Sequence, residues 1–327
     1  MERKIAISVI VPVYKGFRFL REATDSLRRQ SFADWECLLV DDGSKDGSGR
    51  LADEIAAEDT RFRVIHRPNG GTSVARNTAM SLARGRYLAF LDEDDVYHPR
   101  LLEVLFDAAV RTDADVISCG FLKFAEDEHP DFSDMCPEPG DWRVAEGAGV
   151  ADLAAQGYRG IPYEIWTRLF RRELVADHPF PQGVRVEQDY LWIYTLLPRI
   201  RRYAHCDWKG YAWRASSTGG FLHPDFASMM SLLKTTETVY RAMADGMRMN
   251  AEQLRDFRRS TELDLEENVV MRLRKGFRLS RDESREFRLG LRGLESMGID
   301  VRHVLRRKKR FLWTMFLLTG STGWVRK

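Results

Sequence analysis

The chain has few cysteines, little net charge and no long apolar run, and each of these shortages excludes a class of protein. Its four cysteines are scattered over 327 residues, and no pair has the spacing of a metal site. The net charge of +2 argues against a generally basic protein that binds nucleic acid. Apolar residues make up 44% of the chain, which is typical of a globular protein and not of a disordered chain or a membrane bundle. We expect a protein of the reducing cytosol without a signal peptide, because the charged residues 2–4 lead directly into a strand pattern.

Several common signatures of catalysis and phosphate binding are also missing. The chain has no G-x-x-x-x-G-K-[ST] motif, and no G-x-G-x-x-G follows its first strand pattern. Neither a nucleophile elbow nor the ligand spacing of a zinc enzyme occurs. Any nucleotide chemistry must therefore use another type of site.

Strand and helix patterns alternate over the first 120 residues. Apolar runs typical of buried strands occur at residues 5–14, 35–42, 62–66, 87–91 and 114–121. Helical spacing occurs between them, at residues 19–30, around 51–55, at 73–83 and at 101–110, with Asp46 or Ser48 as the candidate cap of the second helix. This alternation predicts an α/β fold with a predominantly parallel sheet.

The pattern changes after this first part. Residues 121–160 read as acidic loops that contain Pro and Gly, and a mixed region with a helix at 189–197 and strands at 203–208 and 211–214 follows. Everything beyond Pro224 has helical spacing. We therefore expect three parts, at residues 1–120, 121–222 and 223–327, the last of them helical.

The most informative stretch is YLAFLDEDDVYHP at residues 87–99. A buried strand pattern ends there at four consecutive acids, Asp92, Glu93, Asp94 and Asp95. Ligands of open α/β sheets gather beyond the carboxyl ends of the strands. Carboxylates crowded at such a place need a compensating charge, and a divalent cation that keeps open positions for a diphosphate supplies it. An acidic loop that caps the next helix is the plainer alternative.

Two other strand ends are expected at the same edge of the sheet. Tyr14 follows the first strand and can stack on a base, while Asp41 and Asp42 end the second and can accept the imino proton of a uracil ring. Arg76, in the helix after RPNGG, can pair with carboxylates or with phosphate as a planar fork. Each residue also has a plainer interpretation. Tyr14 can be a strand-end aromatic, Asp41 and Asp42 can belong to a turn, and Arg76 can be a surface residue of its helix.

Four motifs in a fixed order, SVIVPVY, LLVDDGSKDGS, NGGTSVARN and FLDEDDVYHP, resemble those of the family 2 glycosyltransferases. The resemblance is close over residues 7–99 and loose to about residue 217. It implies a GT-A fold, with a Rossmann-like, mostly parallel sheet flanked by helices. Residues 1–120 would then be the half that binds a nucleotide sugar, and residues 121–222 the half that binds the acceptor. The motifs are specific for the family and not for the sugar.

For the nucleotide, the resemblance implies roles at the first two strand ends. Pro12 and Tyr14 would belong to the base-binding loop, and Asp42 would contact uracil with Asp41 beside it. Arg76 would help to hold the nucleotide end of the donor. The donor implied is a nucleotide sugar, with UDP as the expected nucleotide.

The acidic stretch then corresponds to the family's D-x-D motif, which holds Mn²⁺ or Mg²⁺. The resemblance implies that Asp94 is the direct metal ligand and that Asp92 lies nearer the ribose or a metal-bound water. Glu93 is the middle residue of the motif. Asp95 extends it and braces the loop.

In the acceptor half the family has a Glu-Asp pair ahead of a short helix, with the aspartate as general base. The matching stretch here is GVRVEQDYLW, in which Asp189 matches the aspartate and Gln188 stands where glutamate is usual. Glu187, one residue earlier, is a candidate substitute for that glutamate. An N-cap of the following helix is the plainer interpretation of Asp189.

A later stretch, YAWRASST, resembles the family's Tyr-x-x-Arg-x-x-Ser segment. Arg214 and Ser217 would then close over the diphosphate, with a plain strand end as the alternative. His223 is a further candidate metal ligand.

The resemblance implies an inverting transfer by single displacement, in which the cation neutralises the leaving nucleoside diphosphate and Asp189 deprotonates the acceptor. A non-catalytic nucleotide-sugar-binding or scaffold protein is the alternative of another class, and Gln188 is the feature in its favour. A sugar nucleotidylyltransferase is disfavoured, because its Gly-rich N-terminal signature with a downstream lysine is missing.

Positive charge is concentrated at the C-terminus. Residues 301–327 carry eight basic residues and no acid, which leaves the rest of the chain at −6. The run RRKKR at residues 306–310 precedes FLWTMFLL at 311–318, which is too short to span a bilayer. Such a segment suits either contact with anionic lipid or packing in a homo-oligomer, and a lipid-linked or cell-surface glycan acceptor fits both.

Overall fold

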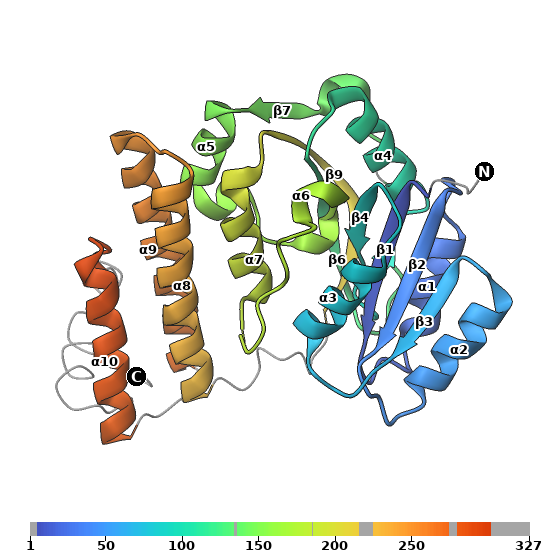
Figure 1. The fold of residues 1–327 in the computed structure, drawn as a ribbon, viewed down its shortest axis with the longest axis horizontal. Helices are drawn as coiled ribbons and strands as arrows, with labels where there is room; N and C mark the ends of the chain where they lie inside the picture. The colour runs from blue at the N-terminus through green and yellow to red at the C-terminus, as the bar shows by residue number, and fades with distance from the viewer. Residues whose placement is uncertain (1–4, 134–135, 185, 216–224, 275–279, 302–327) are drawn as a thin grey trace. The chain divides into compact units, whose positions relative to one another are not determined.

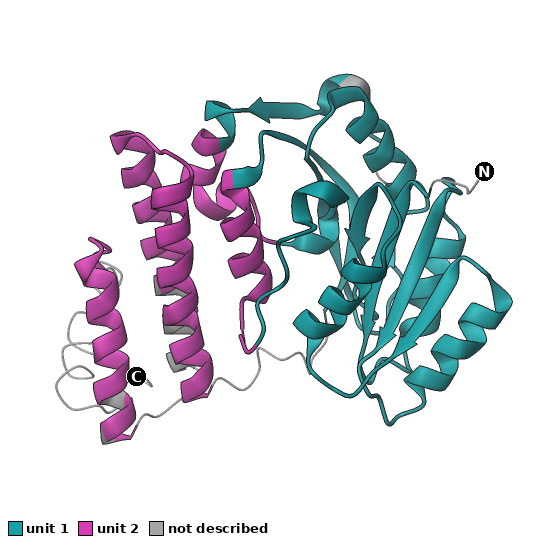
Figure 2. Ribbon diagram, in the orientation of Figure 1, with its two compact units in different colours: residues 1–150, 164–182, 199–217 teal, residues 151–163, 183–198, 218–327 magenta. Residues whose placement is uncertain are grey.

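The computed structural model describes residues 5–133, 136–184, 186–215, 225–274 and 280–301 (Figure 1). The chain divides into two compact units, which Figure 2 distinguishes by colour. Unit 1 comprises residues 1–150, 164–182 and 199–217, and unit 2 comprises residues 151–163, 183–198 and 218–327. Both units therefore take residues from the predicted middle segment, 121–222. The boundary predicted at its end lies outside the described residues.

Unit 1 is built on a sheet whose first four strands are parallel: β1 (Ile7–Val13), β2 (Trp35–Asp41), β3 (Phe62–His66) and β4 (Tyr87–Phe90). They lie in the order β3-β2-β1-β4. Every residue of β1, β2 and β4 is buried, as expected for parallel strands whose faces are covered. The α/β fold predicted from the apolar runs is confirmed.

The crossover helices lie close to their predicted positions, as α1 (Leu20–Arg28), α2 (Ser48–Glu58), α3 (Thr72–Leu82) and α4 (Leu101–Thr112). The N-cap of α2 is Gly47, with a φ of 98°, and neither of the two predicted residues. Asp46 nevertheless supports the helix start, because its carboxylate accepts hydrogen bonds from the N–H of Ser48 at 3.1 Å and from its hydroxyl at 2.6 Å.

The second half of the sheet differs from a simple parallel arrangement because an antiparallel strand is inserted. This strand, β8 (Arg168–Arg171), pairs with β4 on one side and with β6 (Val116–Ala125) on the other. The sequence pattern missed it, because the four residues RLFR carry too little apolar periodicity. Arg168 is nonetheless fully buried, and its guanidinium donates a 2.6 Å hydrogen bond to the carbonyl of Glu164.

Three more strands complete the sheet. β9 (Arg202–Ala215) runs parallel to β6 and joins into one strand the two runs predicted at 203–208 and 211–214. β5 (Val96–Tyr97) and β7 (Arg143–Glu146) pair with β9 in antiparallel fashion. The interpretation of residues 121–160 as loops is wrong for the end of β6, for β7 and for α5 (Ala148–Ala155). Short helical segments are η1 (Pro139–Asp141), η3 (Ile165–Thr167), α6 (Arg172–Val175) and η4 (Leu197–Arg199).

Unit 2 is helical, as predicted for the C-terminal region. It contains most of α5, the turn η2 (Gly157–Arg159), α7 (Gln188–Leu196), α8 (Phe226–Gly246), α9 (Ala251–Arg274) and α10 (Arg281–Ser296). The long helix α8 packs against α7, α9 and α10. Gly157 has a φ of 60°, and a Cβ there would lie 1.9 Å from the hydroxyl of Ser260, so glycine is required where η2 approaches α9.

Within the described residues, no helix is both long enough and apolar enough to cross a membrane. The basic and apolar runs at residues 306–318, predicted to contact a membrane or another subunit, lie outside the described part of the chain.

Candidate functional site

The loops that follow β1, β2 and β4 form the first part of the candidate site, and all belong to unit 1. Pro12 lies inside β1, buried and paired in register with Val40. Tyr14 comes two residues later, with 44% of its surface exposed. Its backbone N–H donates a 3.3 Å hydrogen bond to the carboxylate of Glu93. The end of β1 and the acidic loop after β4 are therefore in contact.

Asp41 shapes the turn at the end of β2. Its carboxylate accepts a 3.0 Å hydrogen bond from the N–H of Ser44 and lies 3.0 Å from Nδ1 of His66, whose Nε2 lies 3.0 Å from Asp53. Burial opposes ionisation of Asp41, but the hydrogen bonds from His66 and Ser44 outweigh it and lower the pKa of this carboxyl. Hydrogen bonds to Asp41 and Asp53 raise the pKa of His66. The turn also requires Gly43, since its φ is 75°.

The carboxylate of Asp42, predicted to contact uracil, accepts hydrogen bonds from the RPNGG loop. The donors are the N–H of Gly71 at 2.7 Å, the N–H of Gly70 at 3.0 Å and the side-chain amide of Asn69 at 3.1 Å. Arg67 adds an ion pair, and only 4% of the Asp42 side chain is exposed. Asp42 therefore fixes the loop that leads into α3. Contact with a base would require it to exchange some of these donors.

Arg76 extends from α3 to the acidic loop. Its guanidinium is 4% exposed, forms a 3.0 Å ion pair with Asp92 and lies 5.2 Å from the ring centre of Phe180. A guanidinium held in this way places a fixed positive charge beside the D-x-D stretch. Arg76 and Asp92, both predicted to bind the donor, are thus brought together.

The next two acids of the loop, Glu93 and Asp94, are partly buried, and the charges of neighbouring carboxylates act on both. Burial, followed by the charges of Asp92 and Asp94, raises the pKa of Glu93 to about 8. Burial and then the charge of Asp92 raise the pKa of Asp94 to about 6. Full ionisation of the loop would therefore create more negative charge than the surrounding protein balances.

Asp95 differs from the other acids because it points into the protein. It is 1% exposed and accepts hydrogen bonds from the hydroxyl of Tyr211 at 2.6 Å and from the N–H of Arg214 at 2.8 Å. Burial, followed by the charges of Asp92 and Asp94, raises the pKa of Asp95 well above its usual range. Its contacts join the acidic loop to β9.

The guanidinium of Arg214, predicted to close over a diphosphate, is occupied by the protein itself. It donates to the carbonyls of Asp94 at 2.7 Å and Glu126 at 2.8 Å, and it forms an ion pair with Glu22. Two phenylalanine rings lie within 4.4 Å of it, and its side chain is 2% exposed. These contacts make Arg214 a support of the acidic loop, and they do not favour the predicted role in donor binding.

Two residues of the predicted site lie outside the described part of the chain, and the predicted metal site is not assembled within that part. Ser217, predicted to bind the diphosphate, and His223, considered as a metal ligand, are among the residues that the structure leaves out. Within the described part of the chain, no group of three or more His, Cys, Asp or Glu side chains is gathered to hold a metal ion. The metal site at Asp92 and Asp94 therefore stays a prediction.

The acids predicted to serve the acceptor lie in unit 2, at the start of α7. Glu187 occupies the N-cap with φ 62° and ψ 35°, a left-handed conformation that is uncommon for residues other than glycine. Asp189 is the second residue of the helix, so its interpretation as the N-cap is wrong. It lies in the first turn, where the helix dipole stabilises negative charge. The amide of Gln188 turns back and donates a 2.7 Å hydrogen bond to the carbonyl of Val184.

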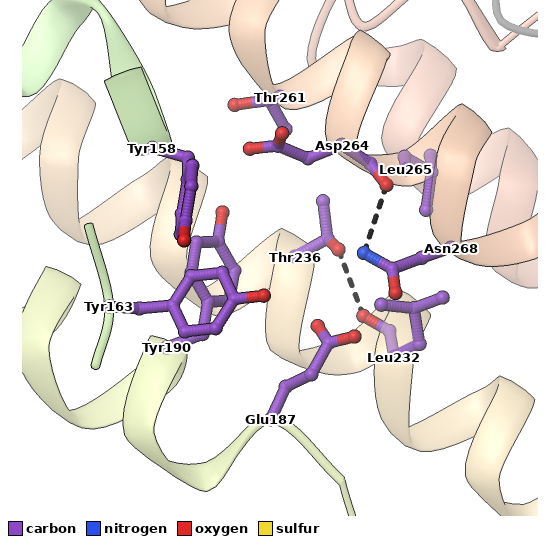
Figure 3. Close-up of a pocket in the computed structure, with 10 residues that line it drawn as sticks. All are labelled: Tyr158, Tyr163, Glu187, Tyr190, Leu232, Thr236, Thr261, Asp264, Leu265 and Asn268. Atoms are coloured by element: carbon purple, nitrogen blue, oxygen red, sulfur yellow. Dashed lines mark hydrogen bonds between the residues drawn. The ribbon is translucent and has the colours of Figure 1, made fainter. Parts of the chain in front are cut away.

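Unit 2 also contains a pocket of about 320 Å³, shown in Figure 3. Its lining includes Tyr158, Tyr163 and Tyr190 together with Glu187 and Asp264. The sequence analysis did not predict this pocket. Its residues come from segments that are far apart along the chain, and no local spacing connects them.

Sequence reasoning also missed the side chains that organise the loops after β2 and β4, above all Arg67, Asn69 and Tyr211. A signal existed for Asn69, because Asn-Gly is a turn dipeptide. In the sequence, Tyr211 stands out only as the tyrosine of the YAWR motif. Its hydrogen bond to Asp95 spans 116 positions of the chain.

The chain is similar to known proteins both in sequence and in fold. The family model described as "Glycosyl transferase family 2" matches residues 8–177. "Uncharacterized glycosyltransferase EpsJ" of Bacillus subtilis (strain 168) is 37% identical over 187 residues, which are 56% of this chain and 53% of that relative. "Glycosyltransferase GlyG" of Streptococcus pneumoniae serotype 4 is 32% identical over 200 residues, covering 56% of this chain and 62% of that relative. The chain thus spans between half and two thirds of these relatives' own length.

Solved structures with a similar fold cover nearly the whole chain. S. aureus TarS, residues 1–349 in complex with UDP-GlcNAc, matches with a TM-score of 0.70 and 16% identity over 98% of this chain and 90% of that one. The mannosyltransferase PcManGT from Pyrobaculum calidifontis, in complex with GDP-Man and Mn²⁺, matches with a TM-score of 0.53 and 16% identity over 96% and 88%. At this level of identity the likeness concerns the fold alone.

Proposed function

The chain belongs to glycosyl transferase family 2 and has the GT-A fold, and from this premise we propose that it transfers a sugar from a nucleotide donor to a hydroxyl group of a glycan acceptor. The observation that carries the proposal is the meeting of three predicted donor-site elements in unit 1. Tyr14 contacts the acidic loop through Glu93, and Arg76 contacts it through Asp92. An exposed aromatic ring, a fixed guanidinium and a group of carboxylates are the parts that a nucleoside diphosphate sugar requires.

We assign UDP as the nucleotide. The exposed ring of Tyr14 offers a stacking surface for a base, and Asp42 is the nearest sequence match to a uracil-reading carboxylate. Among the structures with a similar fold, TarS carries UDP-GlcNAc and PcManGT carries GDP-Man, so the fold accepts either nucleotide. The choice therefore depends on side chains, and Asp42 is the one to test.

The donor set of the acidic loop fits a divalent cation, Mn²⁺ or Mg²⁺. Carboxylate oxygens are hard ligands, and phosphate-bound Mg²⁺ is usually held by one or two carboxylates together with the substrate's own phosphates. Asp95 is occupied by β9 and Asp92 is shared with Arg76, which leaves Asp94 as the best direct ligand and Asp92 as the second. When bound, the cation supplies Lewis-acid stabilisation of the leaving diphosphate.

For the transfer step we assign Asp189 as the general base. The acceptor hydroxyl attacks the anomeric carbon, its proton passes to the Asp189 carboxylate, and the bond from the anomeric carbon to the diphosphate oxygen breaks. Attack opposite the leaving group inverts the configuration. Glu187, at the N-cap of the same helix, is assigned a supporting role. Gln188 cannot act as a base, and its amide is engaged with the carbonyl of Val184.

For the acceptor we propose a cell-surface or lipid-linked glycan. The sequence feature behind this is the basic run followed by an apolar run at residues 306–318, which suits an interfacial position. The expected place of action is the cytoplasm or the inner face of the cell membrane.

The deciding experiment is a panel of UDP-, GDP- and dTDP-sugars incubated with the full chain in Mn²⁺, in Mg²⁺ and in EDTA. The expected result is metal-dependent release of UDP from one UDP-sugar. Tight binding of a nucleotide sugar without turnover in either metal would favour the non-catalytic alternative. Release of pyrophosphate would indicate a nucleotidylyltransferase, and no binding of any nucleotide sugar would refute the proposal.

A further inference from the structure

The acidic loop after β4 sends its side chains to three different parts of unit 1. Asp92 pairs with Arg76 of α3 at 3.0 Å, and Asp95 accepts hydrogen bonds from β9. Between them, the carboxyl group of Glu93 accepts a 3.3 Å hydrogen bond from the main-chain N–H of Tyr14. β1 and β4 are parallel neighbours in the sheet, so the loops that follow them leave the same edge (Figure 1). Glu93 therefore joins the acidic loop to residues 14–17, here named the β1 loop.

The same side chain occupies the space beside Gly16. A Cβ at this position would lie 2.5 Å from Cγ of Glu93 and 3.3 Å from its Cβ, which is closer than carbon atoms pack. The φ of Gly16 is not positive, so its backbone conformation is open to alanine. The Glu93 side chain, and not the backbone of the turn, is therefore what requires glycine here.

The turn after β2 holds the β1 loop from its other side. The N–H of Lys15 donates a 3.2 Å hydrogen bond to the hydroxyl of Ser44, and the N–H of Phe17 donates one of 3.3 Å to the carboxylate of Asp46. Lys15 has a φ of 60°, a left-handed conformation that persists in residues other than glycine only where the surroundings support it. The loop is thus held from the β2 side by Ser44 and Asp46 and from the β4 side by Glu93.

The conformation of the β1 loop also sets the direction of the Tyr14 ring, the proposed stacking surface for the base. The ammonium group of Lys15 lies 5.1 Å from the centre of this ring, and 44% of the tyrosine surface stays exposed. A ring that is already held in the stacking geometry binds a base more tightly than a mobile ring, which loses conformational entropy on binding. Contacts that fix the main chain of Tyr14 therefore contribute to affinity for the nucleoside.

We propose that Glu93 is a positioning residue of the donor site, which joins the acidic loop to the β1 loop and holds the ring of Tyr14 ready for the uracil base. This inference rests on the proposed function, which places the base on Tyr14. The carboxyl group of Glu93 fixes the main chain of Tyr14, and the stem of the side chain fills the space that Gly16 leaves open. Glu93 then supports nucleoside binding without contacting the nucleoside, and it is not a ligand of the cation.

Uridine is the first probe, because it carries the base and has no phosphate through which a cation could act. Its affinity for the full chain is measured by titration with saturation-transfer-difference NMR. Glu93→Ala should weaken uridine binding at least about fivefold, because the loop loses its anchor on the β4 side. Glu93→Gln should stay within about twofold of the wild type, since an amide oxygen accepts the same hydrogen bond. Unchanged binding in Glu93→Ala would overturn the inference, and so would an equal loss in Glu93→Gln.

Gly16→Ala tests the steric part of the inference, because the added methyl group displaces the Glu93 side chain. It should weaken uridine binding about as much as Glu93→Ala, and the double variant should bind no more weakly than either single variant. Additive losses would overturn the inference. Gly149→Ala is the matched control, since a Cβ there would lie 3.7 Å from that of Ala145, an ordinary contact. Thermal unfolding of every variant establishes that it is folded.

A second cycle shows whether Glu93 acts through Tyr14. Its ligand is UDP with Mn²⁺, measured by titration calorimetry, because the phosphates keep binding measurable when Tyr14→Ala removes the ring. Adding Glu93→Ala to Tyr14→Ala should weaken UDP binding by less than about twofold further. A further loss of about fivefold would show that Glu93 contacts the nucleotide itself, and would overturn the positioning role.

Mn²⁺ affinity without nucleotide distinguishes a positioning residue from a metal ligand. The free Mn²⁺ signal in electron paramagnetic resonance measures it, and Glu93→Ala should change it by less than about twofold. A loss as large as that caused by Asp94→Ala would make Glu93 a ligand of the cation and would overturn the inference.

Donor turnover measured in parallel separates this inference from the proposed function. In the transfer assay Glu93→Ala should raise the donor KM at least about fivefold and change kcat by less than about twofold. Metal-dependent UDP release with uridine affinity that does not depend on Glu93 overturns the inference and leaves the proposed function intact. Glu93-dependent uridine binding in a chain that turns over no nucleotide sugar supports the positioning role and overturns the proposed transfer. A wild-type chain that binds neither uridine nor UDP overturns both.

Discussion

The main-chain N–H of Arg214 donates a 2.8 Å hydrogen bond to the buried carboxylate of Asp95, across 119 positions of the sequence. Tyr211, from the same strand, donates its hydroxyl to the other oxygen of that carboxylate at 2.6 Å. The strand β9 thus holds in place the loop whose outer acids, Asp92 and Asp94, we assign to the divalent cation. The contribution of these two hydrogen bonds to the free energy of unfolding can be measured separately from catalysis.

Tyr211→Phe should lower the free energy of unfolding by about 1–3 kcal/mol, because it removes a buried hydrogen bond to a carboxyl group. The matched control is Tyr203→Phe, since Tyr203 lies on the same strand, is equally buried, and its hydroxyl has no hydrogen-bond partner among the described residues. This control should be neutral within about 0.5 kcal/mol. Urea denaturation measures the free energy of unfolding of both variants. An equal decrease in the two variants would contradict the stabilising role of the Tyr211 hydroxyl.

Asp94→Ala should abolish sugar transfer while the fold stays intact, because the residue lies in a loop after β4 and not in the core. EDTA should abolish transfer by the wild type in the same way. Added Mn²⁺ should restore transfer by the EDTA-treated wild type and should not restore transfer by Asp94→Ala. UDP release and circular dichroism are the measurements. Asp127→Ala is the control, since this acid is 85% exposed and pairs with Arg18, which is itself exposed. Full turnover in chelator would refute the assignment of a metal.

Asp42→Ala should weaken UDP binding more than Mn²⁺ binding, and the wild type should bind UDP more tightly than GDP. It should also lower the free energy of unfolding by about 3 kcal/mol, because the variant leaves the Arg67 guanidinium and several loop donors without their carboxylate. Asn69→Ala removes one of those donors and keeps the carboxylate. Titration calorimetry that finds equal losses of UDP affinity in both variants would assign the effect to the loop and not to base reading.

Asp189→Asn should bind UDP-sugar and metal normally but transfer at least about a hundredfold more slowly, which is the lower end for loss of a general base. Glu187→Gln should lose less, because its role is supporting. Single-turnover rates with saturating donor separate chemistry from binding. Near-normal transfer by Asp189→Asn with an inactive Glu187→Gln would show that the register across Gln188 is wrong and that Glu187 is the base.

His66 predicts a small pH dependence of stability. Hydrogen bonds to Asp41 and Asp53 raise its pKa, so folding favours the protonated imidazole. That contribution is fully present below the unfolded pKa of about 6.5 and is lost as the pH rises through the folded pKa. Asp53→Asn should therefore cost about 0.5 kcal/mol at pH 5.5, since both side chains are at least half exposed and screened, and less at pH 9. Denaturation midpoints that show the larger loss at pH 9 would contradict this reading.

By itself the sequence determined the parallel half of the fold. The apolar runs that became β1 to β4 and the helical spacing between them act over a few positions, and they indicated the correct elements. The same local information placed Tyr14, Asp42 and the acids of residues 92–95 at one edge, because neighbouring parallel strands end together. The contacts of Tyr14 with Glu93 and of Arg76 with Asp92 follow from that placement.

Only the tertiary structure decided how these residues are used. It inserted β8 between β4 and β6, turned Asp95 inward to β9, committed Arg214 to the loop and assembled the tyrosine pocket of unit 2. Each of these results depends on hydrogen bonds or ring contacts between residues that are distant along the chain. Such contacts form when folding buries polar groups, because a buried polar group needs a hydrogen-bond partner. The local periodicity of the sequence does not indicate which residue that partner will be.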